Sequence, residues 1–206
     1  MFVSLGWAAL LAILVVCVRT FVVQPFRIPT NAMLPTLHGR TQSPDGSVTI
    51  GDHILVDKLA YRVRDPRRGE IVVFRTDGLN VPRVSRGTYY VKRIVGLPGE
   101  RVTIKPPLLF VNDQRVTEPQ IFQVIQSREQ GYVGFLLPQC HFTPQPILCE
   151  GQDTIMLGKD EYLALGDNQR ASLDGRYWGP LPRSNIVGHV TWIYLPLERA
   201  GSLVGK

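Results

Sequence analysis

The chain has 206 residues, of which 23 are Lys or Arg and 17 are Asp or Glu, so its formal net charge is +6. A hydrophobic content of 44% excludes a disordered chain, and 16 prolines with 19 glycines argue against a helical bundle, because both residues break helices. Three cysteines are too few for a disulfide-built scaffold, and four scattered histidines predict no metal site.

The first apolar segment is long enough for a membrane anchor. Residues 2–18 contain no charged side chain, and a spanning helix needs about 17–25 mostly apolar residues. Arg19 lengthens the span if its side chain reaches the headgroups. We therefore expect a retained transmembrane anchor at residues 1–23. A cleaved secretory signal fits less well, because the segment has no basic start and no A-x-A motif follows it. A lipoprotein signal at Cys17 also fits less well, because no small residues precede the cysteine.

Two cysteines bear on the compartment of the folded domain. Cys140 and Cys149 lie nine positions apart in a Pro/Gln-rich loop, and a bridge between them would indicate an oxidising compartment. Two unpaired thiols are the alternative. The positive-inside rule would keep Arg19 and Arg27 in the cytoplasm, but this rule is weak for large translocated domains. We expect a single-pass protein of the cytoplasmic (inner) membrane, with its domain on the extracytoplasmic side.

After the anchor, short apolar alternations recur between turn residues, which is typical of β-strands. Turns are expected at Gly46, Gly69, Gly99 and Gly166. The pattern predicts a mostly β domain with an antiparallel, closed or coiled sheet. The expected strands are 48–50, 54–56, 71–74, 89–95, 102–104, 108–111, 162–165 and 186–194.

The domain divides by the strength of this pattern. Residues 24–116 and 153–206 form the expected β core, whereas 117–152 are rich in Gln and Pro, weakly patterned, and expected as an excursion from the main sheet. The basic residues are spread along the chain, so we expect no nucleic-acid partner. Anionic lipid headgroups near the anchor are the better partner.

The segment 24–36, directly after the anchor, is expected at the membrane surface. Pro25 and Pro29 favour an extended or turning backbone. A plain linker is the alternative, but it would be more polar and would not contain apolar residues such as Phe26 and Ile28.

A lysine lies within the expected strand 89–95. With a period of two, Tyr90, Lys92 and Ile94 share one face, so apolar side chains flank the lysine. Desolvation lowers the pKa of a lysine, and a neutral lysine can act as a general base. A surface lysine whose stem covers apolar neighbours is the alternative, and the local pattern alone favours it.

The segment 166–180 is dense in Gly, Asp, Asn and Ser, which indicates a structured loop. Within it, Asp174 and Arg176 are candidates for an ion pair. An ordinary turn is the alternative.

Taken in order, these segments resemble the type I signal peptidases, the membrane-anchored Ser/Lys endopeptidases of bacteria. The resemblance spans about residues 5–116 and 160–197. It rests on Pro29-x-x-x-Met33-x-Pro35-Thr36, then Lys92-Arg93-x-Val95-Gly96-x-Pro98-Gly99, then Gly166-Asp167-Asn168 with Ser172-x-Asp174-x-Arg176. It implies a transmembrane helix followed by a coiled antiparallel β-sheet domain that removes signal peptides from exported preproteins after small residues (A-x-A), without metal or cofactor.

The chain departs from this family at the position of the nucleophile. The family carries its serine just before the methionine of the first motif, and here Ala32 stands there. A methyl group cannot attack a carbonyl, so the resemblance implies a site whose nucleophile is missing. The alternatives are a serine that was replaced and a natural homologue that lacks it. Thr30 is two residues away and is no obvious substitute, and Gly175 stands where many relatives carry serine.

The resemblance also implies a role for each remaining site residue. Lys92 would be the general base and Ser172 would orient its amine, while the Thr30 hydroxyl and the backbone N–H of residue 32 would bind the oxyanion. Asp174 and Arg176 would brace the loop that carries Ser172, with Asp167 and Asn168 as structural support. The positions that match shallow pockets for small side chains are Phe26, Ile28, Pro29, Met33, Leu37, Ile54, Val73, Tyr90 and Val91.

Three other functions remain possible from the sequence. A soluble Ser/Lys self-cleaving repressor shares the dyad but has no anchor. A membrane-tethered pseudo-peptidase would bind export signals without cutting, and Ala32 favours it. An anchored β domain with a purely structural role would leave the motifs around Lys92 and Ser172 unexplained.

Overall fold

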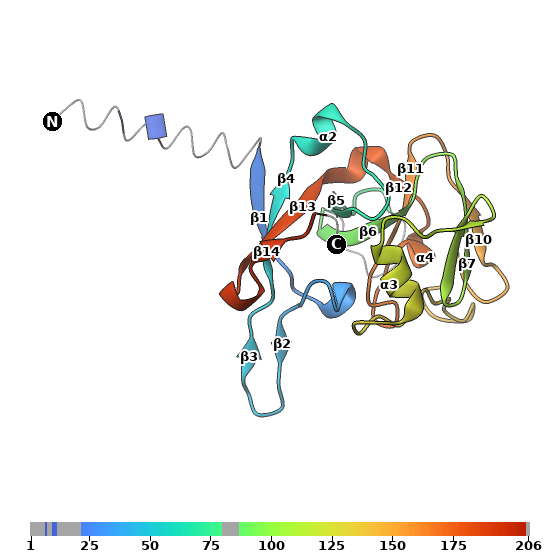
Figure 1. Ribbon diagram of the computed structural model, residues 1–206, viewed down its shortest axis with the longest axis horizontal. Coiled ribbons are helices and arrows are strands. Elements are labelled where there is room, and N and C mark those ends of the chain that lie inside the picture. The colour runs from blue at the N-terminus through green and yellow to red at the C-terminus, as the bar shows by residue number, and fades with distance from the viewer. Residues whose placement is uncertain (1–6, 8–9, 12–21, 80–86, 205–206) are drawn as a thin grey trace.

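The computed structural model describes residues 7, 10–11, 22–79 and 87–204 (Figure 1). The expected anchor at residues 1–23 therefore lies almost entirely outside the described residues. In the part of the chain that is described, no helix is long and apolar enough to cross a membrane.

An antiparallel sheet of eight strands forms the body of the described domain (Figure 1). The strands pair in the order β1-β4-β13-β5-β6-β11-β12, and β14 pairs with β13. A second sheet has the order β10-β7-β8-β9, and β2 with β3 forms a hairpin that projects from the domain. The strands are β1 Val23–Arg27, β2 Thr41–Gln42, β3 Val48–Thr49, β4 His53–Asp57, β5 Ile71–Arg75, β6 Tyr89–Gly96, β7 Arg101–Lys105, β8 Leu108–Val111, β9 Gln114–Arg115, β10 Thr154–Met156, β11 Glu161–Leu165, β12 Leu181–Pro182, β13 Ile186–Leu195 and β14 Gly201–Ser202.

The described helices are all short. Three are α-helical and three are 3-10 helices, and each lies between strands. They are η1 Asn31–Met33, α2 Ala60–Val63, α3 Ile121–Ser127, α4 Gly175–Trp178, η2 Arg183–Asn185 and η3 Leu197–Arg199.

The predicted mostly β, antiparallel architecture is confirmed. Each expected strand is present with ends within about one residue of those expected from alternation and turn residues. Gly46, Gly69 and Gly99 have φ of +83°, +88° and +77°, a conformation in which a side chain is strained, so glycine ends the strands there. The sequence did not predict β1, whose Pro25 weakens the strand pattern, or the short strands β2, β9, β10, β12 and β14. It also did not predict α3, which is too short to show a helical period.

The central strands are buried on both faces. On β5, Ile71 and Val73 pack with Ile28 and Met33 in one core cluster, whereas Val72 and Phe74 face another. A third cluster joins β7 and β8 to the segment 117–152; its members from that segment include Phe122, Ile125, Tyr132, Phe135 and Leu148.

The segment 117–152 thus supplies apolar side chains to a core cluster and carries α3. Its cysteines are joined in a disulfide, Cys140–Cys149, whose Cα atoms are 5.1 Å apart.

Candidate active site

A cavity of about 290 Å³ lies between β1, η1, the first half of β6 and the loop after β11. Most of its lining is apolar, and Lys92 and Ala32 both line it. The other lining residues are Phe26, Arg27, Ile28, Pro29, Thr30, Met33, Thr88, Tyr89, Tyr90, Val91, Ala171 and Leu173.

Lys92 is buried in β6, with a relative exposure of 4%. Its Nζ donates to the carbonyl oxygen of Val91 at 3.1 Å and lies 5.5 Å from the ring centroid of Tyr90. Burial lowers the pKa of Lys92 from 10.5 to about 8, because a charged amine loses its hydration there. The lysine therefore becomes neutral within a moderately alkaline range.

Two nearby carboxylates do not restore the charge of Lys92, because each is bound to an arginine. Asp174 and Asp167 both raise the pKa of the lysine, but by less than burial lowers it. Asp174 accepts from Arg176 at 2.8 and 2.9 Å, and Asp167 accepts from Arg93 at 2.8 and 2.7 Å. Burial alone would raise the pKa of Asp174, yet its bonds to Arg176 hold that pKa below its usual value.

The loop from Gly166 to Asp174 is held in place by the same ion pair. Asp174 accepts from the backbone N–H of Gly166 at 3.0 Å and caps α4 by accepting from the Arg176 N–H at 3.2 Å. The guanidinium of Arg176 donates to the carbonyl of Ser172 at 3.3 Å. Ser172 is 7% exposed, and its Oγ has no hydrogen-bond partner among the described residues. Its hydroxyl is thus buried and available to a neighbour.

Close backbone packing brings this loop against η1. A Cβ placed on Gly166 would lie 2.1 Å from the Ser172 Oγ and 2.6 Å from the carbonyl oxygen of Ala32. Asn168 binds η1 twice, through its backbone N–H to Ala32 at 3.1 Å and its side-chain amide to Asn31 at 3.0 Å. Only glycine fits at position 166, and Asn168 fixes the backbone at position 32.

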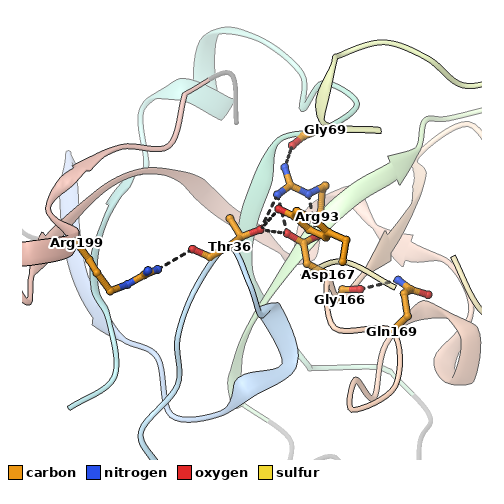
Figure 2. Close-up of polar contacts among 8 residues, drawn as sticks. Thr36, Gly69, Arg93, Gly166, Asp167, Gln169 and Arg199 are labelled. Carbon is orange, nitrogen blue, oxygen red and sulfur yellow. Dashed lines mark hydrogen bonds and ion pairs between the residues drawn. The ribbon is translucent and has the colours of Figure 1, made fainter. Parts of the chain in front are cut away.

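Behind η1, a buried network connects three segments that are distant in sequence. Figure 2 shows the guanidinium of Arg93 facing the carboxylate of Asp167, with the Gly69 carbonyl on its other side at 2.7 Å. Thr36 donates to Asp167 and lies 2.7 Å from the Tyr132 hydroxyl. The sequence indicated Asp167 but not Tyr132, which lies in the weakly patterned segment 117–152.

The structure separates the expected pocket residues into two groups. Phe26, Ile28, Pro29, Met33, Tyr90 and Val91 line the cavity, and Thr30 lies at its exposed side. Leu37, Ile54 and Val73 are completely buried and do not line it; they pack in the core cluster that contains Ile28 and Met33.

Five lining residues were not expected, namely Arg27, Thr88, Tyr89, Ala171 and Leu173. Tyr89 packs edge to face on Phe26 with ring centroids 5.2 Å apart, and both rings line the cavity. Proximity in sequence to expected site residues such as Phe26, Tyr90 and Ser172 is the one signal that could have indicated them. Among the described residues, no cluster of His, Cys, Asp or Glu could hold a metal ion.

Comparison with known proteins assigns the family. The model of the family "Signal peptidase, peptidase S26" matches residues 2–195. The chain belongs to the signal peptidase family, peptidase S26. The signal peptidase I of Leptolyngbya laminosa is 32% identical over 192 residues, covering 93% of this chain and 78% of the relative. The probable signal peptidase I-2 of Synechocystis is 33% identical, covering 93% and 72%.

A solved signal peptidase I from Enterococcus faecalis is also similar to this chain. It overlaps 62% of this chain and 98% of its own, with 24% identity and a TM-score of 0.44. The assignment to the peptidase S26 family does not depend on this partial overlap.

Proposed function

We propose that the cavity binds the extended cleavage region of signal peptides on exported preproteins, with small side chains of an A-x-A motif in its apolar recesses. The observation that carries this proposal is that Lys92, residue 32 and two strand edges meet at one cavity in a chain of the peptidase S26 family. Relatives named signal peptidase I support the substrate class.

Two strand edges at the cavity favour an extended peptide. β1 is the end strand of the large sheet and pairs with β4 alone in the described part of the chain. On β6, residues 89–92 pair with β5, whereas β11 pairs only with residues 93–96. Among the described residues, both β1 and the first half of β6 thus leave one edge open for backbone hydrogen bonds with an added strand.

With a serine at position 32, these residues would perform acyl transfer. Neutral Lys92 would take the serine proton and return it to the leaving amine, while Ser172 would orient the amine of Lys92. The backbone N–H of residue 32 and the hydroxyl of Thr30 would stabilise the oxyanion. Asp174 and Arg176 would hold in place the loop that carries Ser172. No step requires a metal or cofactor.

Ala32 removes the nucleophile from this scheme. We infer that the present chain binds signal peptides without cutting them by the Ser/Lys route, because alanine has no hydroxyl to attack the carbonyl. The chain is then either a peptidase whose serine has been replaced or a natural pseudo-peptidase that binds export signals.

The proposal includes a membrane location. Residues 1–23 would anchor the chain in the cytoplasmic membrane, and the folded domain would lie on the extracytoplasmic side, close to the bilayer from which signal peptides emerge. The disulfide Cys140–Cys149 supports an oxidising compartment.

The substitution Ala32→Ser tests this function. We expect the present chain to bind a peptide with an A-x-A signal but not cut it, and the Ala32→Ser chain to cleave after that signal. The double variant Ala32→Ser/Lys92→Met should bind without cleaving, because an unassisted serine is a poor nucleophile near neutral pH.

The outcomes separate the alternatives. Peptide binding without cleavage by a folded Ala32→Ser chain would remove the peptidase scheme and favour the pseudo-peptidase. Failure of both chains to bind the peptide, by isothermal titration calorimetry in detergent or lipid, would overturn the proposed substrate class.

A further inference from the structure

Besides position 32, where alanine has no nucleophile, the cavity contains other side chains that could react with an electrophile. Among the described lining residues, the nucleophilic side chains are the hydroxyls of Thr30 and Thr88, the phenols of Tyr89 and Tyr90, and the amine of Lys92. Burial raises the pKa of Tyr90, so its phenol stays protonated and weakly nucleophilic. The threonine hydroxyls have no general base apart from Lys92. An amine lone pair is more nucleophilic than the oxygen of a hydroxyl or phenol group, so Lys92 is the strongest nucleophile among the described lining residues.

The surroundings of Lys92 leave its lone pair accessible. A neutral amine can give one proton to the Val91 carbonyl, which is 3.1 Å away, and still present its lone pair. The charged groups that act on it are Asp174, Asp167 and Arg176, and both carboxylates are already bound to arginines. Lysines that are desolvated in this way form Schiff bases with carbonyl compounds.

We propose that Lys92 covalently captures carbonyl electrophiles, specifically peptide aldehydes that end in a small residue, as an imine within the cavity. This inference rests on the proposed function, because the peptide-binding edges of β1 and β6 would deliver the aldehyde. The amine adds to the aldehyde carbon to give a carbinolamine, and loss of one water then forms the C=N bond. No oxidation occurs, and the two protons of the amine leave with the aldehyde oxygen.

Ala32 decides which group receives the electrophile. A serine at position 32 would compete for the same carbon and form a hemiacetal, whereas the methyl group of alanine cannot react. The replacement of serine by alanine thus makes the lysine the reactive centre of the cavity.

Reductive trapping tests the proposal in the full chain. The probe is a short peptide aldehyde with an Ala-x-Ala end, incubated at pH 8 with sodium cyanoborohydride, which reduces the imine to a stable secondary amine. Peptide mapping by mass spectrometry then locates the label. At pH 8, the neutral fraction of a lysine with the ordinary pKa is about a hundredfold smaller than that of a lysine whose pKa is near 8. We therefore expect the labelling of Lys92 to exceed that of other lysines at least about tenfold.

Internal and variant controls make the result specific. The exposed lysines Lys105 and Lys159 report non-specific labelling in the same sample. Lys105→Met should leave the trapping rate unchanged, and Lys92→Met should abolish it. The matching peptide alcohol, which cannot form an imine, should bind and slow the labelling of Lys92.

The possible failures are distinguishable. Equal labelling of Lys105 and Lys159, or full labelling of the Lys92→Met chain, would overturn the inference. Binding of the peptide alcohol without trapping of the aldehyde would also overturn it, while leaving the proposed function intact. Absence of both binding and trapping would overturn the proposed function and the inference together.

Discussion

Lys92 is the residue whose environment contributes most to the chemistry of the site. Alternation placed it between Tyr90 and Ile94 on one face of a strand, but the same pattern also fits a surface lysine. In the structure it is 4% exposed, and the carboxylates near it are occupied by Arg93 and Arg176. The pKa of Lys92 is therefore low because the amine is buried and because the described carboxylates near it are already paired with arginines.

This environment predicts a pH-dependent stability. The pKa of Lys92 is about 8 in the folded chain, against 10.5 as its ordinary value, so the unfolded chain binds more protons between these pH values. Stability therefore rises with pH across this window, by about 3 kcal/mol at about 1.4 kcal/mol per pKa unit. Urea unfolding from pH 7 to 10.5 should show this rise relative to Lys92→Met.

The matched control is Lys105→Met, which removes an exposed lysine on β7. It should follow the unsubstituted chain at every pH. If Lys92→Met and the unsubstituted chain show parallel stability curves, Lys92 keeps its proton in the folded state and cannot serve as the base.

At the scale of elements, the site depends on the contact between η1 and the loop 166–174. Asn168 binds the backbone of η1, and Arg176 binds the backbone of the loop at Ser172. Gly166 lets the two segments meet, because a side chain there would overlap both of them. The geometry of residue 32 relative to Lys92 is therefore set by backbone packing as well as by side chains.

Gly166→Ala tests this contact. The added Cβ would lie 2.1 Å from the Ser172 Oγ and 2.6 Å from the Ala32 carbonyl, so one segment must move. We expect a loss of about 1–3 kcal/mol in unfolding free energy and weaker binding of an A-x-A peptide. Chemical denaturation and calorimetry measure the two effects.

Gly201→Ala is the control for the same chemical change, since a Cβ on Gly201 meets nothing within 4 Å. Its effect should stay within about 0.5 kcal/mol. Equal effects of the two substitutions would show that the contact between η1 and the loop is not tight.

At the scale of the molecule, the segment 117–152 contacts residues that hold the candidate site in place. Tyr132 hydrogen-bonds with Thr36, and the carbonyl of Leu136 accepts from Arg176 at 3.0 Å. The backbone N–H groups of Ile147 and Leu148 donate to the Arg176 carbonyl at 2.7 and 2.9 Å, within the loop that the disulfide closes. A segment with little sequence pattern thus contacts the candidate site at both Thr36 and Arg176.

The proposed location predicts the exposure of this segment in cells. Glu129 is exposed, so Glu129→Cys should react with a membrane-impermeant maleimide on intact cells if the domain lies outside the cytoplasmic membrane. The parent chain, which retains Cys17, gives the background. Labelling that appears only after lysis would reverse the proposed orientation.

The sequence by itself determined eight of the strands and the turns at Gly46, Gly69 and Gly99. These features are local: alternation fixes which residues extend, and glycines at Gly46, Gly69 and Gly99 provide the positive φ that ends a strand. The sequence also determined that position 32 carries no nucleophile, because that is a matter of residue type alone.

Only the tertiary structure decided which of these side chains share a cavity. Leu37, Ile54 and Val73 are as apolar as Ile28 and Met33, but they lie in the core and do not line the cavity. In a strand that is buried on both faces, the sequence does not distinguish a core residue from one that lines a cavity. The pairing of Arg93 with Asp167 joins residues 74 positions apart. Contacts of that range, rather than local pattern, leave Lys92 buried without a free carboxylate among the described residues near it.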